Sequence, residues 1–129
     1  MLTYLLKNRS LFWQGKTLDL WTIPHTLSGL LIAYVFVLME WNTLVGFFVA
    51  LGLAILWEVF ETKTGLSKKE PHLNGLGDVV VAQIGYIGGL YVFAKAGGTV
   101  LDAKIAAAAF LIFSAISLLG WASHRLYAK

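Results

Sequence analysis

The sequence predicts an all-α integral membrane protein: a bundle of four transmembrane helices with an interfacial amphipathic helix at its N-terminus. The first observation behind this fold class is composition, because 58% of the 129 residues are hydrophobic and the mean hydropathy is +0.74. The second is distribution, because four separate apolar stretches each approach the length that a ~30 Å hydrocarbon core requires. We therefore expect one membrane domain covering residues 1–129.

The first element, residues 1–22, mixes leucine and aromatic side chains with three basic residues. This composition predicts a helix lying on the membrane surface, with Trp13 and Trp21 at the level of the lipid headgroups. The segment lacks a basic n-region and its apolar start is too short for a signal peptide, so we expect no cleavage. A partly ordered tail is the alternative interpretation.

Four predicted spans follow this segment. They cover residues 23–39, 43–60, 79–94 and 105–121. The first two are joined only by Glu40-Trp41-Asn42, so they should form a tight antiparallel hairpin. The longer segment 61–77 contains charged residues, one proline and three glycines, and is predicted to be a loop. Its Asn74-Gly75 pair is a turn signal, and Gly77 would allow a sharp turn before the third span.

Charge distribution orients the bundle. With four spans, both termini and the loop 61–77 lie on one side of the membrane. Eight of the ten basic residues fall on that side, namely Lys7, Arg9, Lys16, Lys63, Lys68, Lys69, Arg125 and Lys129. Only Lys95 and Lys104 fall on the other side. The positive-inside rule therefore places both termini in the cytoplasm, and we expect a bacterial inner membrane as the location.

Composition also excludes several functions. Without cysteine the chain has no disulfide framework, no thiolate metal site and no cysteine nucleophile. The net charge of +3 is modest and the basic residues flank the spans, so nucleic-acid binding is not expected. The expected partners are membrane lipids, together with a second copy of the chain or another subunit of a membrane complex.

Four ionisable residues lie at the cytoplasmic ends of the predicted spans. His25 opens the first span, Glu58 and Glu61 close the second, and Asp78 opens the third. Rows of small residues at helical spacing lead to three of them. These rows are His25, Gly29 and Ala33; Gly46, Ala50, Ala54 and Glu58; and Asp78, Ala82, Gly85 and Gly89. Because small residues mark contact faces between membrane helices, we expect the acids to point into the bundle.

A structural interpretation exists for each of these residues. Asp78 could cap its helix, and His25, which follows Pro24, could be a hydrogen-bonded residue of a first turn capped by Thr22. Glu58 and Glu61 differ, because carboxylates in a last turn face the negative end of the helix dipole. They also lie one turn apart, so they require a cation or a shared proton. The structural source of that cation would be Lys63, Lys68 or Arg125.

Three pieces of the sequence together carry a family resemblance: HTLSGLLIAY at 25–34, LWEVFE at 56–61 and DVVVAQIGYIGG at 78–89. They resemble the YjdF-like and VanZ-like small bacterial integral membrane proteins. In those proteins a His opens one span with a Gly four residues later, a Trp or Tyr with Glu-x-x-Glu closes the next, and an Asp opens a third. The resemblance implies a shared site and an association with the cell envelope. Its positions here are His25, Gly29, Glu58, Glu61, Asp78 and Gly85.

Two positions depart from the family pattern. Such proteins often carry an acid shortly before the His, and the nearest acid here is Asp19. They also carry an aromatic residue after the second Glu, where this chain has Thr62.

Two functions remain open from the sequence, and whether the protein is an enzyme is left undecided. In the first, His25, Glu58, Glu61 and Asp78 bind Mg²⁺, Mn²⁺ or Zn²⁺, with oxygen-rich ligation favouring the harder ions. The ion would bridge to a lipid phosphate or an envelope precursor, and Glu61 and His25 would be the catalytic acid/base residues. In the second, the chain is a non-catalytic structural or accessory subunit whose polar cluster is an interhelical network.

Overall fold

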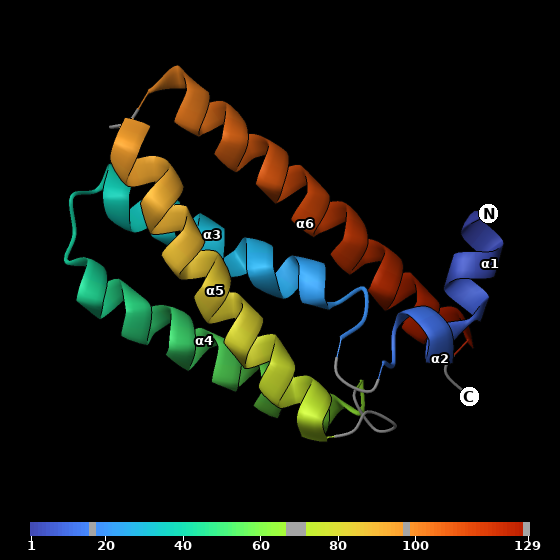
Figure 1. Cartoon of the computed structure of the whole chain (residues 1–129). Helices are drawn as coiled ribbons and strands as arrows, with labels where there is room; N and C mark the ends of the chain where they lie inside the picture. The colour runs from blue at the N-terminus through green and yellow to red at the C-terminus, as the bar shows by residue number, and fades with distance from the viewer. Residues whose placement is uncertain (16–17, 67–71, 97–98, 128–129) are drawn as a thin grey trace.

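The computed structural model describes residues 1–15, 18–66, 72–96 and 99–127. Within these ranges the chain forms helices and turns and contains no β-strand, so the predicted all-α class is confirmed. Figure 1 shows the helices α1 (Leu2–Lys7), α2 (Arg9–Phe12), α3 (Thr22–Leu38), α4 (Thr43–Thr64), α5 (His72–Ala96) and α6 (Val100–Tyr127).

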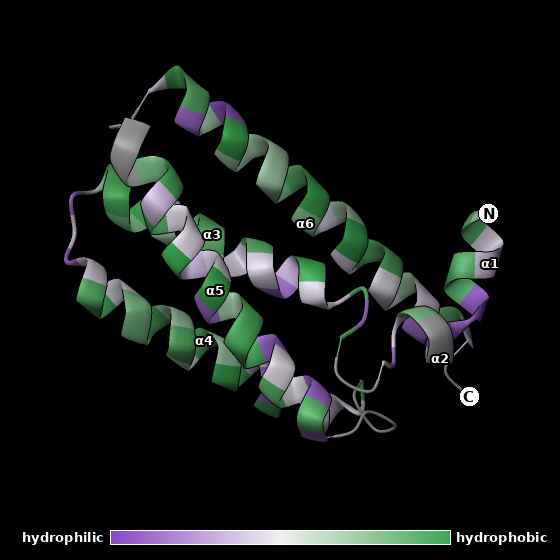
Figure 2. Cartoon of the chain, viewed as in Figure 1, coloured by the Kyte–Doolittle hydropathy of each residue, from purple (hydrophilic) through white to green (hydrophobic). Residues whose placement is uncertain are grey.

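Three of these helices, α4, α5 and α6, are long and apolar enough to cross a membrane. The fourth apolar helix, α3, is shorter, with 17 residues. Figure 2 shows that hydrophobic residues cover most of the length of the four helices, whereas hydrophilic residues lie mainly towards their ends. The positions of all four helices agree with the four apolar stretches of the sequence.

Helix α3 lies at the centre of the bundle and packs against α4, α5 and α6, most extensively against α5. Glycine makes the contact with α5 close. A Cβ atom added to Gly29 would collide with the carbonyl oxygen of Ala82, and one added to Gly85 would collide with the carbonyl oxygen of Thr26. The two backbones therefore touch, as small residues allow in membrane helices.

The rows of small residues predicted for the contact faces are buried. On α4 they are Gly46, Ala50 and Ala54, and on α3 they are Gly29 and Ala33. Tyr86 of α5 is fully buried between these rows, and its hydroxyl donates a hydrogen bond to the carbonyl oxygen of Thr43 (2.6 Å). The predicted contact faces of the helices are thus confirmed.

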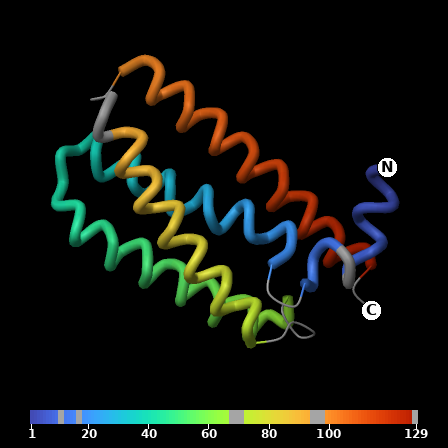
Figure 3. Tube along the Cα trace, in the orientation of Figure 1, coloured from blue at the N-terminus to red at the C-terminus, as the bar shows by residue number. Residues whose placement is uncertain are grey.

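Successive long helices run in alternating directions, which gives the bundle two distinct ends (Figure 3). The terminal end holds α1 and α2, the starts of α3 and α5, and the ends of α4 and α6. The hairpin end holds the tight connection 39–42 between α3 and α4, together with the start of α6. The predicted α3–α4 hairpin is confirmed, and Asn42 caps α4 by accepting hydrogen bonds from the N–H groups of Leu44 and Val45.

The loop predicted for residues 61–77 is longer than the connection between α4 and α5, because helix occupies both ends of the predicted range. Helix α4 continues to Thr64 and ends at Gly65, which has the left-handed backbone conformation (φ 77°), and α5 begins at His72. Between them, residues 67–71 lie outside the described residues. The helices extend past the apolar stretches because backbone hydrogen bonding does not depend on side-chain hydropathy. Asp78 therefore lies in the second turn of α5 and is not its N-cap.

The N-terminal segment forms the two short helices α1 and α2, with Asn8 between them, and not one amphipathic helix. Trp13 is fully buried, and its indole N–H donates to the carbonyl oxygen of Leu5 (3.1 Å). Its ring packs edge-on against Trp21, with the ring centroids 5.6 Å apart. Both tryptophans cover Gly120 of α6, where a side chain would collide with them. The two residues predicted to face headgroups are therefore packed against protein.

Candidate metal site at the terminal end

Three ionisable side chains from three helices meet at the terminal end of the bundle. Nε2 of His25 on α3 lies 3.6 Å from Oδ2 of Asp78 on α5 and 4.0 Å from Oε1 of Glu58 on α4. One donor atom from each residue lies within 4.8 Å of the others, so the group could hold a metal ion. His25 is 7% exposed, Asp78 is 2% exposed, and the side chain of Glu58 is 21% exposed. The predicted convergence of these three residues is confirmed.

Asp19 fixes the start of α3 and with it the position of His25. Its carboxylate accepts hydrogen bonds from the N–H groups of Trp21 (2.8 Å) and Gly15 (3.1 Å). Its own N–H donates to the hydroxyl oxygen of Thr22 (3.1 Å). Asp19 therefore fixes the turn that leads into α3, and His25 lies in the first turn of that helix. The N-cap residue itself is Trp21, which forms no side-chain capping hydrogen bond, so the cap predicted at Thr22 is not observed.

Asn74 joins the start of α5 to the same segment. Its side-chain N–H groups donate to the carbonyl oxygen of Gly15 (2.8 Å) and to the carboxylate of Asp19 (3.0 Å), and the residue is fully buried. Asp78 follows one turn later on the same face of α5. Asn74 was predicted to be part of a turn. Its bond to Asp19, the acid nearest to His25 in the sequence, was not predicted.

Gly75 allows Glu58 to approach α5. A Cβ atom at this position would lie 2.5 Å from Oε2 of Glu58, closer than real Cβ contacts. The glycine therefore leaves room for the flexible end of a side chain from a neighbouring helix. It does not form the turn that its pairing with Asn74 had indicated.

Glu61 is separated from the three converging residues. It is buried on α4, and its Oε1 accepts a hydrogen bond from the indole N–H of Trp57 (2.7 Å). Among the described residues it is not part of the group whose donor atoms meet. Residues three apart on a helix point in directions that differ by about 60°, so Glu58 and Glu61 contact different neighbours.

Neither Lys63 nor Arg125, two of the three predicted partners of Glu58 and Glu61, forms a salt bridge with them in the described part of the chain. Within the described ranges, the salt bridges of Glu58 involve His25 alone, and Glu61 forms none. Lys63 and Arg125 are exposed, and Lys68 lies outside the described residues. Nε2 of His25 and Oε1 of Glu58 are buried without a hydrogen-bond partner in the described part of the chain. Buried charges usually pair or coordinate a metal, and His25, Glu58 and Asp78 could hold one.

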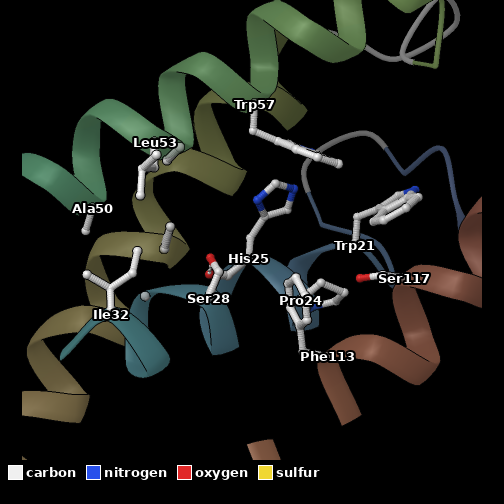
Figure 4. A pocket seen from close by; sticks show the side chains of 13 residues that line it. Trp21, Pro24, His25, Ser28, Ile32, Ala50, Leu53, Trp57, Phe113 and Ser117 are labelled. Atoms are coloured by element: carbon white, nitrogen blue, oxygen red, sulfur yellow. Dashed lines mark hydrogen bonds between the residues drawn. The ribbon is translucent and has the colours of Figure 1, made fainter. Parts of the chain in front are cut away.

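A cavity of about 440 Å³ adjoins the site (Figure 4). Its walls are mostly apolar, and His25 is the ionisable residue among those that line it. Glu58, Glu61 and Asp78 do not line the cavity. His25 therefore belongs both to the lining of the cavity and to the group of three converging side chains.

No protein-family model, no curated protein and no solved structure matches this chain. A function for this chain therefore rests on the geometry of the site itself.

Proposed function

We propose that this chain is a four-span integral membrane protein that binds a divalent metal ion through His25, Glu58 and Asp78. The observation that carries this proposal is the meeting of one imidazole nitrogen and two carboxylates from three different helices. The carboxylates of the buried Asp78 and the partly buried Glu58 repel each other where the dielectric constant is low. A divalent cation would neutralise both, and the imidazole would supply a third ligand.

The spacing of the donor atoms supports a small transition-metal ion. Ligand atoms bound tetrahedrally to Zn²⁺ at ~2.0–2.2 Å lie about 3.4 Å from one another. The separations of 3.6 Å and 4.0 Å from Nε2 of His25 are close to this value. A set of one nitrogen and two oxygens suits Zn²⁺ or Mn²⁺ better than the oxygen-rich set of three carboxylates, which pointed towards Mg²⁺.

Three protein ligands leave a coordination position open, as in catalytic zinc sites. An anionic oxygen of a lipid phosphate or an envelope precursor would take this position, and the ion would act on it as a Lewis acid. Under this proposal Glu61, one helical turn from Glu58, would act as a general base and not as a ligand. The resemblance to the YjdF-like and VanZ-like proteins supports the same residues and an envelope role.

The terminal end is proposed to face the cytoplasm. Lys7, Arg9, Lys63 and Arg125 belong to elements of this end, whereas Lys104 lies at the hairpin end. The other basic residues counted on the cytoplasmic side, Lys16, Lys68, Lys69 and Lys129, lie outside the described residues. The distribution of the described cations supports the positive-inside orientation.

A second candidate function is a non-catalytic subunit held together by the same polar residues. The specific observation behind it is the 3.6 Å separation between Nε2 of His25 and Oδ2 of Asp78, which a protonated imidazole would turn into an ion pair. Such a pair would fix the register of α3 and α5 and would need no metal.

Metal titration of the full chain in detergent separates these functions. The wild-type protein should bind one Zn²⁺ or Mn²⁺ ion per chain, measured by equilibrium dialysis and, for Mn²⁺, by electron paramagnetic resonance. Glu58→Gln and Asp78→Asn should weaken binding by more than the ~10–100-fold that loss of an outer-shell partner causes. Glu40→Gln at the hairpin end is the control and should bind like the wild type. Absence of stoichiometric metal in the wild-type protein would refute the metal site and favour the second function.

A further inference from the structure

The cavity exists because α4 and α6 do not meet. Both helices pack against α3, yet within the described residues no Cα atom of α4 lies within 8 Å of a Cα atom of α6. The cavity between them is lined by residues of α3 and by Ala82 of α5. Figure 4 shows His25 and Trp57 near one another in this space, with Phe113 and Ser117 contributed by α6.

The cavity extends from the terminal end towards the middle of the bundle. Along α3 its lining runs from His25 to Ile32, and along α4 from Trp57 to Ala50. Seven residues of helix correspond to about 10 Å. The long direction of the cavity therefore follows the helices, and its volume of about 440 Å³ falls within the ~300–1,000 Å³ typical of small-molecule sites.

The chemistry of the lining suits a hydrocarbon chain. Apart from His25 and the two tryptophans, the polar side chains that line the cavity are Ser28 and Ser117. The hydroxyl of Ser28 already donates to the carbonyl oxygen of His25 (2.7 Å). Next to the cavity, Leu53 of α4 and Leu118 of α6 are 51% and 70% exposed. If the bundle spans a membrane, such side chains face acyl chains, so the molecules nearest to the cavity are lipids.

The polar end of the cavity determines which lipid fits. A chain that fills the cavity reaches His25, and carboxylate oxygens of Asp78 and Glu58 lie 3.6 Å and 4.0 Å from Nε2 of its ring. Without a cation those carboxylates would repel an anionic headgroup. With a divalent ion between the carboxylates, a phosphomonoester is complementary to the polar end of the cavity, because its oxygens are ligands for such ions.

We propose that the cavity binds one acyl chain of a phospholipid whose terminal phosphate coordinates the metal ion held by His25, Glu58 and Asp78. This inference rests on the proposed metal function. It adds a ligand of defined chemistry: a chain in the apolar cavity between α4 and α6, and a phosphomonoester at the polar end.

Retention of phosphatidic acid by the full chain tests the inference. The protein in detergent is loaded with Mn²⁺ and phosphatidic acid and examined by native mass spectrometry, with metal content measured in parallel. The wild type should retain one lipid per chain, and chelation with EDTA should lower retention. Ser117→Phe and, separately, Leu53→Trp place bulk in the cavity from partly exposed positions, which limits the cost to folding.

Each cavity variant should lower lipid retention by at least ~10-fold, as expected when a pocket excludes one or two methylene groups. Metal content should not change. Ala107→Phe, on an exposed face of α6 outside the cavity, is the matched control and should retain the lipid like the wild type. Both cavity variants retaining the lipid fully would overturn the inference.

Two further outcomes identify what has failed. Equal retention of phosphatidylcholine, whose phosphate is capped by choline, would overturn the assignment of the headgroup. A wild-type protein without stoichiometric Mn²⁺ would refute the proposed metal function, whereas normal Mn²⁺ binding with lipid retention insensitive to the cavity variants would refute the lipid inference alone.

Discussion

Two buried aspartates at opposite ends of the bundle have different surroundings. Asp102, at the hairpin end, is 1% exposed and lies in the first turn of α6. Its carboxylate accepts the N–H of Thr99 (3.0 Å), and its own N–H donates to the hydroxyl oxygen of Thr99 (3.4 Å). Asp78, at the terminal end, is 2% exposed and lies in the second turn of α5, facing His25 of another helix.

The difference shows that burial alone does not mark a functional carboxylate. At a helix start, unpaired backbone N–H groups and the positive end of the dipole stabilise an acid locally, so the role of Asp102 is explained by α6 itself. One turn further along, backbone N–H groups bond within the helix. Asp78 instead faces side chains of other helices, His25 of α3 and Glu58 of α4, and this meeting makes it part of a candidate site.

The largest effect is expected from metal removal, which should separate the two aspartates. An ion present at ~1,000 times its Kd stabilises the folded protein by about 4 kcal/mol, so EDTA should lower the wild-type unfolding temperature markedly. Asp78→Asn should unfold at the same temperature with and without Mn²⁺. Asp102→Asn should keep the metal-dependent difference while losing ~1 kcal/mol from its weakened cap. Thermal unfolding followed by circular dichroism measures the unfolding temperature of each variant. If Mn²⁺ raised that temperature for Asp78→Asn as much as for the wild type, Asp78 would not differ from Asp102 in metal binding.

A smaller effect is expected from the two asparagines that hold the two ends. Asn74→Ala removes two partly buried hydrogen bonds, one to the carbonyl oxygen of Gly15 and one to the carboxylate of Asp19, so it should lower the free energy of unfolding by about 1–3 kcal/mol. Asn42→Ala removes an exposed helix cap and should cost about 1 kcal/mol or less. Equilibrium unfolding by SDS in mixed micelles gives both values. Equal losses would mean that the terminal end is not held more tightly than the hairpin end.

The smallest effect on stability is expected from two glycines of α5. Gly75→Ala pushes the flexible carboxylate of Glu58 away from the site and should weaken Mn²⁺ binding by about tenfold, which corresponds to ~1.4 kcal/mol. Gly88→Ala meets no atom within 4 Å, so it should leave metal binding unchanged and stabilise the helix slightly. Metal titration of both variants checks this. An unaltered affinity in Gly75→Ala would show that the approach of Glu58 to α5 is not needed for the site.

Much of the bundle could be predicted because its determinants are local. The apolar stretches set the positions of α3 to α6, and the short connection between Met39 and Asn42 dictates the hairpin. The rows of small residues predicted which faces touch, since helical spacing alone places Gly46, Ala50 and Ala54 on one side of α4. The ends of helices were less predictable. Asn74 and Gly75 have the composition of a turn, and only contacts with Asp19 and Glu58 explain their position inside α5.

The N-terminal segment shows the same limit. Trp13 and Trp21 have the side chains of interfacial anchors, but they pack on Gly120, which is about 100 residues away in the sequence. A contact between residues so far apart leaves no periodic pattern in either segment. Composition therefore predicted a surface helix, although both tryptophan rings are buried.

The sequence by itself determined that His25, Glu58 and Asp78 lie at one end of the bundle, because alternating helix directions and apolar lengths require it. It also determined that small-residue faces bring their helices close. Only the tertiary structure decided that Glu61 accepts a hydrogen bond from Trp57 and lies apart from the other three residues. This depends on the rotation of α4 about its own axis as it packs on α3. The cavity beside His25 likewise follows from a gap between α4 and α6, two helices that share a neighbour without touching.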